Sequence, residues 1–378
     1  MPGDQWVIGR KKLIRLALVG DASNINVRLW VAGLLSAGAD IEIVSFAEWP
    51  DAPVPVHVMK IPAGAGKLRY LLCGPQVRRA VDRIDPQIVV GYYATGYGTA
   101  ARLARRHPLV QVVVGNDVLV NPPGTPTHAV ARRNLAAADL VVGWSKELDV
   151  AAARFGVAES RRFVSIRGIP TERFPAPRSI PPGPPRLITT RALHPYYQTD
   201  RVVGAMAHMT QSATLTIAGE GSERSRLEEQ VTRLGLEDRV AFVGAIPHEE
   251  LGARLREHHV YVSAVPSDGV SGSLLEAMCS GLVPVAIDNL ANREWIENGV
   301  NGLLVSAGSP IEALAAACDR ACTDAALRAA ALETNRGMVV GRADLRANGP
   351  VFVRRFQELR EGYGARRADG SRHRLRGG

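Results

Sequence analysis

The chain has 378 residues, of which 46% are hydrophobic and 22% charged, and a formal net charge of +9. This length suffices for roughly two or three domains that each bury a core, and the composition excludes a largely disordered chain. No apolar run approaches the ~20 residues of a membrane-spanning helix, and Arg15 interrupts the apolar run near the N-terminus. We therefore expect a cytoplasmic protein without a signal peptide.

The first half of the chain alternates short apolar runs with helical patterns. Runs rich in Val and Ile predict buried strands, and the segments between them carry apolar residues at helical spacing. This alternation is typical of a mostly parallel, doubly wound sheet. The predicted strands are 13–19, 41–46, 87–92, 110–114 and 139–144, and the predicted helices are 26–38, 67–84, 97–107, 128–138 and 146–156.

A proline-rich stretch separates this half from a second block of the same kind. Residues 174–186 contain six prolines, which exclude a helix or a central strand and indicate a linker. The second block has predicted strands at 186–190, 214–218, 239–244, 260–265, 282–288 and 302–305. We thus predict an α/β protein with an N-terminal domain (1–174), a linker (175–185), a C-terminal domain (186–345), a helix returning to the first domain (346–363) and a disordered basic tail (364–378).

The segment 267–281, SDGVSGSLLEAMCSG, lies between a predicted strand and an apolar helix. Its glycines let the backbone approach a ligand closely, and the N–H groups at a helix start attract an anion. The segment therefore predicts a diphosphate site. The backbone groups expected to form it are those of Gly269, Val270, Ser271, Gly272, Ser273 and Leu274.

Two carboxylates flank this loop. Asp268 and Glu276 suit hydroxyl groups of a sugar and a ribose better than they suit phosphate. The alternative is a capping box, S-x-x-E, in which Glu276 merely satisfies the backbone N–H of Ser273. The motif alone leaves both interpretations open.

The region from Leu215 to Val305 resembles the donor domain of retaining glycosyltransferases of family 4, which have the GT-B fold. The resemblance rests on 217–229, 239–251 and 274–305, and more weakly on 15–46, 92–98, 112–123, 138–148 and 167–174 in the first half. It implies two doubly wound Rossmann-like domains that face each other across a cleft. The first would bind the acceptor and the second the nucleotide-sugar donor.

The resemblance also implies roles for single residues of the second domain. Glu276 would hold the nucleotide ribose, and Asp268, where the family has a glutamate, would contact the donor sugar. Arg191 would bind the donor phosphates, and Gly219 and Gly244 belong to the implied nucleotide-sugar site.

Two family residues are missing. The phosphate-binding lysine falls on Tyr196 or Tyr197, and the first domain has no histidine in the segment 112–119. Asp117 is the polar candidate there. It would orient the acceptor hydroxyl or stabilise positive charge at the anomeric carbon, and the alternative is that it caps its own loop. Asn24 and Asn26, in the loop after the first strand, are further candidates on the acceptor side.

For this family the resemblance implies front-face displacement, in which the leaving diphosphate helps to deprotonate the acceptor, without a metal or other cofactor. We expect a glycan or lipid-linked acceptor in polysaccharide, glycolipid or cell-envelope synthesis. The arginine-rich helices suit contact with the inner face of an anionic membrane, whereas no nucleic-acid-binding pattern accompanies them. The alternatives are a GT-B nucleotide-sugar epimerase and a nucleotide-sugar-binding pseudoenzyme, since the lysine and histidine are missing.

Overall fold

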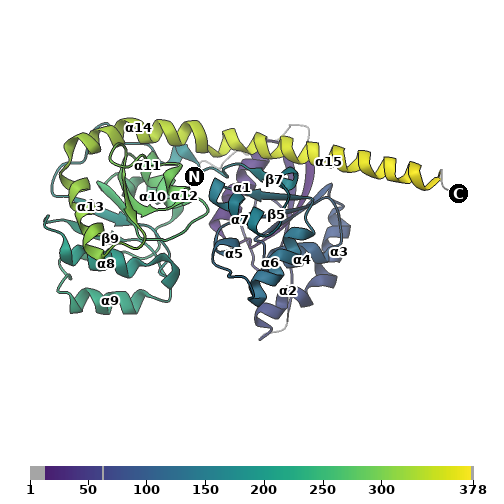
Figure 1. Ribbon diagram of the computed structural model, residues 1–378, viewed down its shortest axis with the longest axis horizontal. Coiled ribbons are helices and arrows are strands. Elements are labelled where there is room, and N and C mark those ends of the chain that lie inside the picture. The colour runs from purple at the N-terminus through teal and green to yellow at the C-terminus, as the bar shows by residue number, and fades with distance from the viewer. Residues whose placement is uncertain (1–12, 62–63, 376–378) are drawn as a thin grey trace. The chain divides into compact units, whose positions relative to one another are not determined.

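The computed structural model describes residues 13–61 and 64–375 and divides into two compact units (Figure 1). The chain enters the second unit at Ile169 and leaves it after Asp344, and the residues from Leu345 onward return to the first unit. Residues 1–12 and 376–378, on which part of the expectations about a signal peptide and a tail depend, lie outside the described residues. None of the helices within the described ranges combines the length and apolarity needed to cross a bilayer.

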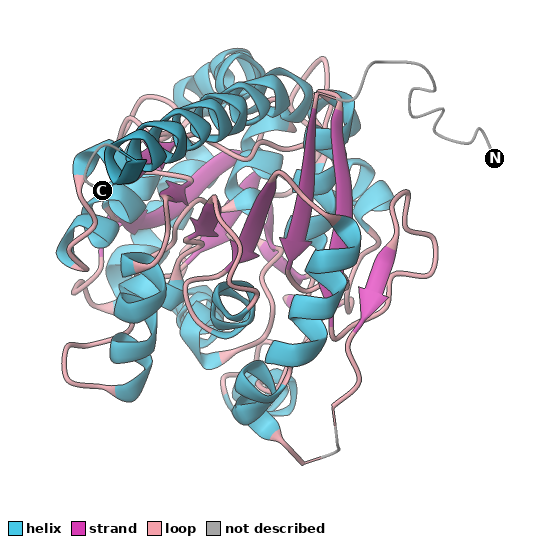
Figure 2. Cartoon of the chain, turned by 90° about the vertical axis from the view of Figure 1, so that its right-hand side faces the viewer, coloured by secondary structure: helices cyan, strands magenta, loops and turns pink. Residues whose placement is uncertain are grey.

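The first unit contains a parallel sheet of seven strands in the order β3-β2-β1-β4-β5-β6-β7. Figure 2 shows helices on both faces of it, which explains why its central strands read as continuous apolar runs. The strands are β1 Ile14–Val19, β2 Ala39–Ser45, β3 Val56–Val58, β4 Ile88–Tyr92, β5 Leu109–Val112, β6 Leu140–Gly143 and β7 Arg162–Val164. The helices are α1 Ile25–Ser36, α2 Arg69–Leu72, α3 Gly74–Ile84, α4 Gly96–Leu103, α5 Asn116–Leu119, α6 Pro126–Ala136, α7 Lys146–Arg154 and α15 Leu345–Leu375, with short 3₁₀ turns η1 Gly66–Leu68 and η2 Glu159–Arg161.

The second unit contains a parallel sheet of six strands in the order β10-β9-β8-β11-β12-β13. Its strands are β8 Arg186–Thr189, β9 Thr214–Ile217, β10 Val240–Phe242, β11 Val260–Ser263, β12 Val283–Asp288 and β13 Leu303–Ser306. Its helices are α8 Thr199–His208, α9 Arg224–Arg233, α10 His248–Leu255, α11 Gly272–Cys279, α12 Leu290–Arg293, α13 Ile311–Thr323 and α14 Ala325–Ala343, with 3₁₀ turns η3 Thr171–Arg173 and η4 Pro195–Tyr197. Strand order reverses between β8 and β11, and in such sheets ligands bind where the order reverses, beyond the carboxyl ends of the strands.

The proline-rich segment 175–185 contains neither helix nor strand, but it belongs to the second unit instead of joining the two. His259 accounts for part of this placement, because its Nε2 lies 2.8 Å from the carbonyl oxygen of Pro181. The arginine at the start of β8, Arg186, donates to the carbonyl oxygen of Pro182. Prolines leave backbone carbonyls free to accept such bonds, so the segment packs on its own domain.

Helix α15 packs against α1 in the first unit. Gly349 makes the close approach possible, since a Cβ there would lie 2.1 Å from the carbonyl oxygen of Gly33. The ring of Trp30 packs edge-on against Phe352 and Phe356. The prediction of a disordered tail from residue 364 is wrong for residues 364–375, because α15 continues to Leu375. No proline follows Pro350 in the helix, and arginine and leucine favour helix even in a polar stretch.

Candidate functional site

Arg191 lies at the point where the strand order of the second unit reverses. It follows β8, and Gly219 follows the neighbouring strand β9. A Cβ on Gly219 would lie 2.1 Å from the carbonyl oxygen of Arg191, so only glycine lets the two loops approach. Gly219 therefore acts on this site through the position of Arg191.

The guanidinium of Arg191 binds three side chains, two from the loop after β11 and one from the first turn of α11. Its Nη2 donates to Asp268 Oδ2 at 2.7 Å, and its Nη1 donates to Ser271 Oγ at 2.7 Å and to Ser273 Oγ at 3.0 Å. The hydroxyl of Tyr261 lies 2.8 Å from Ser273 Oγ. The structure thus brings together Arg191, Asp268, Ser271 and Ser273, which the sequence had assigned to one site.

Neighbouring side chains stabilise the positive charge of Arg191. Burial opposes that charge, but Asp268 together with the tyrosines Tyr261 and Tyr197 outweighs burial and raises the pKa of Arg191. The guanidinium carbon also lies 4.5 Å from the centroid of the Tyr197 ring, a cation–π arrangement that favours the cation. Arg191 is therefore a fixed positive charge beside the loop predicted to receive a diphosphate.

Tyr196 and Tyr197 stand where the family has a lysine, and they have different roles here. Tyr197 stacks against the guanidinium of Arg191. The hydroxyl of Tyr196 donates a short hydrogen bond to the carbonyl oxygen of Ser267. Burial, with the nearby charge of Asp268, raises the pKa of Tyr196 to about 12, so this phenol stays neutral at physiological pH and supplies a donor without a charge.

Helix α11 begins after Ser271, whose Oγ accepts a hydrogen bond from the backbone N–H of Leu274 at 3.2 Å. This cap makes Leu274 the third helical residue and places Glu276 two positions beyond the partner of a capping box. The capping-box alternative for Ser273 and Glu276 is therefore wrong. One predicted phosphate donor, the N–H of Leu274, is already used by the cap.

The carboxylate of Glu276 is buried and pairs with a histidine that the sequence analysis missed. Its Oε1 lies 2.9 Å from Nε2 of His248, the first residue of α10. The ring of Phe174 packs edge-on against this histidine at 5.4 Å between centroids. Within the described ranges, Nδ1 of His248 is buried without a hydrogen-bond partner. The sequence signal was weak, since a histidine before two glutamates reads as an ordinary helix start.

The other predicted glycine of this unit, Gly244, follows β10. Its φ of +75° lies in the left-handed region that favours glycine, and a Cβ there would lie 3.0 Å from Oε1 of Glu220. Gly269 and Val270 lie with Asp268 in the short connection from β11 to α11, and Gly272 is the first residue of α11. The small side chains at these positions would leave the backbone N–H groups accessible to a ligand. That these groups contact a ligand stays a prediction.

Asp117 lies in the first unit and is 3% exposed. Oδ2 accepts the backbone N–H of Ala94 at 2.6 Å, and Oδ1 accepts those of Val114 and Gly115 at 3.0 and 2.9 Å. Burial raises the pKa of Asp117, and these backbone hydrogen bonds counteract part of that rise. The contacts favour the loop-capping alternative, because Asp117 ties the loops after β4 and β5 together.

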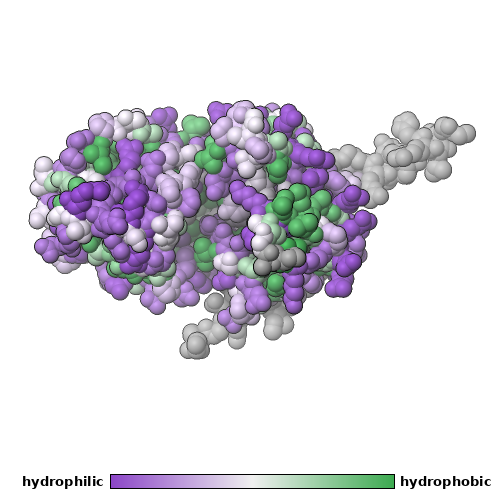
Figure 3. All heavy atoms as spheres, turned by 90° about the horizontal axis from the view of Figure 1, so that it is seen from below, coloured by the Kyte–Doolittle hydropathy of each residue, from purple (hydrophilic) through white to green (hydrophobic). Residues whose placement is uncertain are grey.

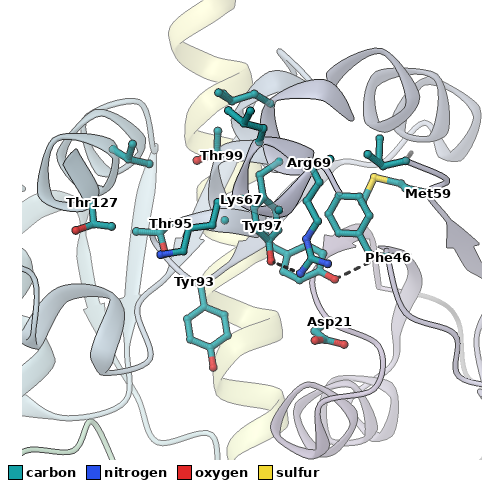
Figure 4. A pocket seen from close by; sticks show the side chains of 18 of the residues that line it. Asp21, Phe46, Met59, Lys67, Arg69, Tyr93, Thr95, Tyr97, Thr99 and Thr127 are labelled. Carbon is teal, nitrogen blue, oxygen red and sulfur yellow. Dashed lines mark hydrogen bonds between the residues drawn. The ribbon is translucent and has the colours of Figure 1, made fainter. Parts of the chain in front are cut away.

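A cavity of about 1210 Å³ lies in the first unit at the carboxyl ends of β1, β2 and β4. Figure 4 shows Asp21, Phe46, Arg69 and Tyr97 around it. Of the candidates after the first strand, Asn24 lines this cavity and caps α1 by accepting the N–H of Asn26 at 2.8 Å. This is where the strand order of the first sheet reverses, between β1 and β4.

Comparison with known families assigns each unit separately. Residues 170–338 match the family described as Glycosyl transferases group 1, and residues 15–145 match the one described as Glycosyl transferase 4-like. Each match falls entirely within one of the two units. Together they support a glycosyltransferase.

Among curated relatives, the chain is 26% identical over 315 residues to a 2-deoxystreptamine glucosyltransferase of Streptomyces kanamyceticus, covering 81% of this chain and 76% of that one. It is 33% identical over 98 residues to the GtfA subunit of a UDP-N-acetylglucosamine–peptide N-acetylglucosaminyltransferase of Streptococcus agalactiae. That match covers 26% of this chain and spans only 19% of the streptococcal protein.

Solved structures show the same fold at low identity. A sucrose-phosphate synthase from Thermosynechococcus elongatus superimposes with a TM-score of 0.80 at 19% identity, covering 92% of this chain and 99% of that one. The Anabaena protein HepE in complex with UDP-glucose gives 0.74 at 19% identity, covering 93% and 100%. The predicted fold class, two Rossmann-like domains of the GT-B type, is confirmed.

Proposed function

We propose that this chain, both of whose units match glycosyltransferase families, is a retaining, metal-independent glycosyltransferase that moves a sugar from a nucleotide diphosphate to an acceptor hydroxyl. The observation that carries the proposal is the buried guanidinium of Arg191 at the strand reversal of the second unit, bonded to Asp268, Ser271 and Ser273. A fixed cation beside the start of a helix is suited to a diphosphate. Solved relatives of this fold that hold UDP and UDP-glucose support a nucleotide-sugar donor.

In this proposal Arg191 stabilises the charge that develops on the leaving diphosphate. Such preorganised electrostatic stabilisation is worth most where water is scarce, and the Arg191 side chain is only 11% exposed. Asp268, released from Arg191 when phosphate replaces it, then accepts hydroxyl groups of the donor sugar. The family implies that the diphosphate itself takes the acceptor proton, so no protein nucleophile is required.

Glu276 holds the nucleotide ribose. Its Oε1 is fixed by His248, which sets the orientation of the carboxylate before the ligand arrives. A carboxylate offers two oxygens to the two hydroxyls of a ribose. Its burial at 7% exposure strengthens hydrogen bonds to a bound sugar, because water competes less.

The acceptor, by this proposal, is a glycan or a lipid-linked sugar used in polysaccharide, glycolipid or cell-envelope synthesis, and the protein works at the inner face of a membrane. The arginine-rich composition, with 46 Lys and Arg against 37 Asp and Glu, suits an anionic surface. The relatives named above act on different acceptors, so the acceptor class is part of the proposal.

The experiment is incubation of the full chain with UDP-, GDP- and ADP-sugars without and with EDTA, followed by NMR of the released sugar. We expect slow release of nucleotide at a rate that EDTA does not change. The released sugar should first have the same anomeric configuration as the donor. Formation of an epimer would support an epimerase on the same fold, and binding without any release would support a pseudoenzyme. Release of the inverted anomer would refute the retaining mechanism.

A further inference from the structure

The segment 66–72, GKLRYLL, exposes all of its leucines. Leu68, Leu71 and Leu72 are 63%, 54% and 57% exposed. They lie on η1 and α2, and Figure 3 shows hydrophobic side chains gathered on the face of the first unit to which α2 belongs. Single exposed leucines are common, but three within five residues form a patch that indicates a binding surface.

This exposure is not a failure of the segment to pack, because Tyr70 anchors it. The Tyr70 ring packs edge-on against Phe46 at 5.4 Å and against Tyr97 at 5.3 Å between centroids. A Cβ on Gly96 would lie 3.1 Å from the Tyr70 ring, which shows how closely the ring is held. The Tyr70 ring packs on the domain, and the three leucines of this anchored element stay exposed, Leu68 and Leu71 at the cavity described above and Leu72 outside it.

Two cations accompany the leucines. Lys67 and Arg69 are both exposed, and Arg69 extends over the rings of Phe46 and Tyr70, at 5.0 and 4.9 Å from their centroids. A short apolar segment with Lys and Arg beside it is the composition of elements that lie in the headgroup region of an anionic bilayer. Residues 66–72 contain no acidic side chain.

The same segment forms one wall of the cavity described above. Residues 64–71 line it together with Asp21, Phe46 and Tyr97, and Tyr70 packs on both of these aromatic rings. A molecule held in a membrane beside the leucines therefore has a cavity within reach, at the carboxyl edge of the sheet. The exposed leucines and the cavity are adjacent, because the same segment carries the leucines and lines the cavity.

We propose that residues 66–72 enter the surface of an anionic bilayer and that the cavity behind them receives the headgroup of a lipid-linked acceptor. The first half deepens the membrane location of the proposed function by naming the surface that would contact the bilayer, and the second half rests on the acceptor proposed there. A folded protein partner fits less well, because leucine is under-represented among residues that dominate protein interfaces. Three leucines on a short helix also provide far less area than the ~1,200 Å² of a stable complex.

The first test is sedimentation of the full chain with vesicles of phosphatidylcholine alone and of phosphatidylcholine with an equal part of phosphatidylglycerol. We expect association with the anionic vesicles at low salt, weakened at moderate salt because exposed charges are screened. Replacing Leu68, Leu71 and Leu72 together by Ser is expected to weaken it about tenfold or more, since each buried methylene contributes to binding.

A matched control replaces Leu234, Leu290 and Val300 by Ser. These side chains are 40%, 49% and 49% exposed and belong to the second unit, so their loss should change vesicle binding less than about twofold if only residues 66–72 enter the bilayer. Absence of association with anionic vesicles at low salt, or an equal loss in the control, would overturn the proposal. Calorimetry with nucleotide-sugars is expected to be unchanged in both variants, which separates this proposal from the proposed function.

A second measurement does not depend on the triple variant folding. The native cysteines Cys73, Cys279, Cys318 and Cys322 are all buried, so a dye that senses polarity can be attached selectively at Leu72→Cys and, as the control, at Leu290→Cys. We expect a blue shift with anionic vesicles for the dye at 72 and none at 290. No shift at 72, or equal shifts at both, would contradict membrane entry.

For the acceptor half, short-chain and long-chain lipid-linked sugars are compared as acceptors. We expect the long-chain acceptor on anionic vesicles to be used with a KM about tenfold lower than the same headgroup in solution, since the bilayer concentrates both partners. Equal KM values in a chain that still releases nucleotide would overturn a bilayer-presented acceptor while leaving glycosyl transfer standing.

Discussion

Arg191 and Asp268 neutralise each other across the loop where a diphosphate is proposed to bind. Their Nη2 and Oδ2 atoms lie 2.7 Å apart, and the two side chains are only 11% and 18% exposed. A donor diphosphate must therefore compete with Asp268 for the guanidinium. In the proposed function, the ion pair holds the arginine in place before the donor binds, and the carboxylate is then free to contact the donor sugar.

This competition predicts opposite effects of Asp268→Asn on binding and on turnover. We expect a nucleoside diphosphate to bind several-fold more tightly, because the phosphate no longer displaces a carboxylate from Arg191. Sugar transfer should fall about 10²-fold, since one polar contact to the reacting sugar is lost. Calorimetry and turnover measured together check this. Asp288→Asn, which removes an exposed pair with Arg293 in the same unit, is the control and should leave both unchanged; weaker diphosphate binding in Asp268→Asn would contradict the competition.

The pair of His248 and Glu276 leads to a prediction about the ribose. His248→Leu removes the group that orients Glu276 Oε1, so we expect the donor KM to rise about tenfold with little change in kcat. His248→Gln, whose amide can donate to the same oxygen, should restore most of it. We expect the ratio of affinities for ribose and 2′-deoxyribose nucleotides to fall in His248→Leu. If His248 were only structural, its replacement would lower the melting temperature and leave this ratio unchanged. His208→Gln, on an exposed face, is the control.

Much of this fold was open to prediction from the sequence because buried parallel strands are written as runs of Val, Ile and Leu. All eleven predicted strands occur in the structure, within a few residues of their predicted ends. The two missed strands, β3 and β7, are three-residue edge strands, too short to show a period. The predicted helix 67–84 is broken before Gly74, where Pro75 opens a new helix.

The site was predicted less completely, for a physical reason. Arg191, Asp268 and Ser271 lie beside strand ends, and strand ends of a parallel sheet meet at one edge, so their assembly follows from topology. The pairing of His248 with Glu276 depends instead on how α10 packs beside α11, which no local pattern encodes. The proline-rich segment was likewise assigned by composition, whereas its carbonyls find partners within the second unit.

Tyr196 provides a test in the alkaline range. Its folded pKa, about 12, lies above the ordinary value of 10.0, so the folded state holds its proton more tightly than the unfolded state does. Its contribution to stability is therefore complete below pH 10 and is lost as the pH rises toward 12. Tyr196→Phe should lose less stability than the natural chain as the pH rises from 10 to about 12, as measured by urea unfolding. The kcat of both should be flat between pH 7 and about pH 9, since a neutral phenol has no charge to lose. A limb in that range that disappears in Tyr196→Phe would contradict this.

Gly219→Ala tests whether the glycine after β9 positions Arg191. The new methyl group would meet the Arg191 carbonyl oxygen at 2.1 Å, so we expect a loss of about 1–3 kcal/mol in the free energy of unfolding from the forced backbone shift, together with weaker donor binding. Gly308→Ala is the matched control in the same unit, because a Cβ there meets nothing within 4 Å. Equal, small losses of stability in both variants would show that the loop after β8 can shift at little energetic cost and that Gly219 does not position Arg191.

Variants of Asp117 distinguish a catalytic role of this residue from a role in holding the loops of the first unit together. Removing its carboxylate in Asp117→Ala leaves the backbone N–H groups of Ala94, Val114 and Gly115 without their acceptor, and each buried unpaired donor costs about 1–3 kcal/mol. We therefore expect a large drop in the melting temperature, with activity lost in proportion to unfolding. Asp117→Asn keeps one carbonyl oxygen for part of this set, so it should lie between the natural chain and Asp117→Ala in both stability and turnover. A direct part in the reaction would give a different pattern, in which Asp117→Asn folds as stably as the natural chain but turns over far more slowly. Thermal unfolding followed at the same time as nucleotide release distinguishes the two, because only the architectural role ties the two losses together.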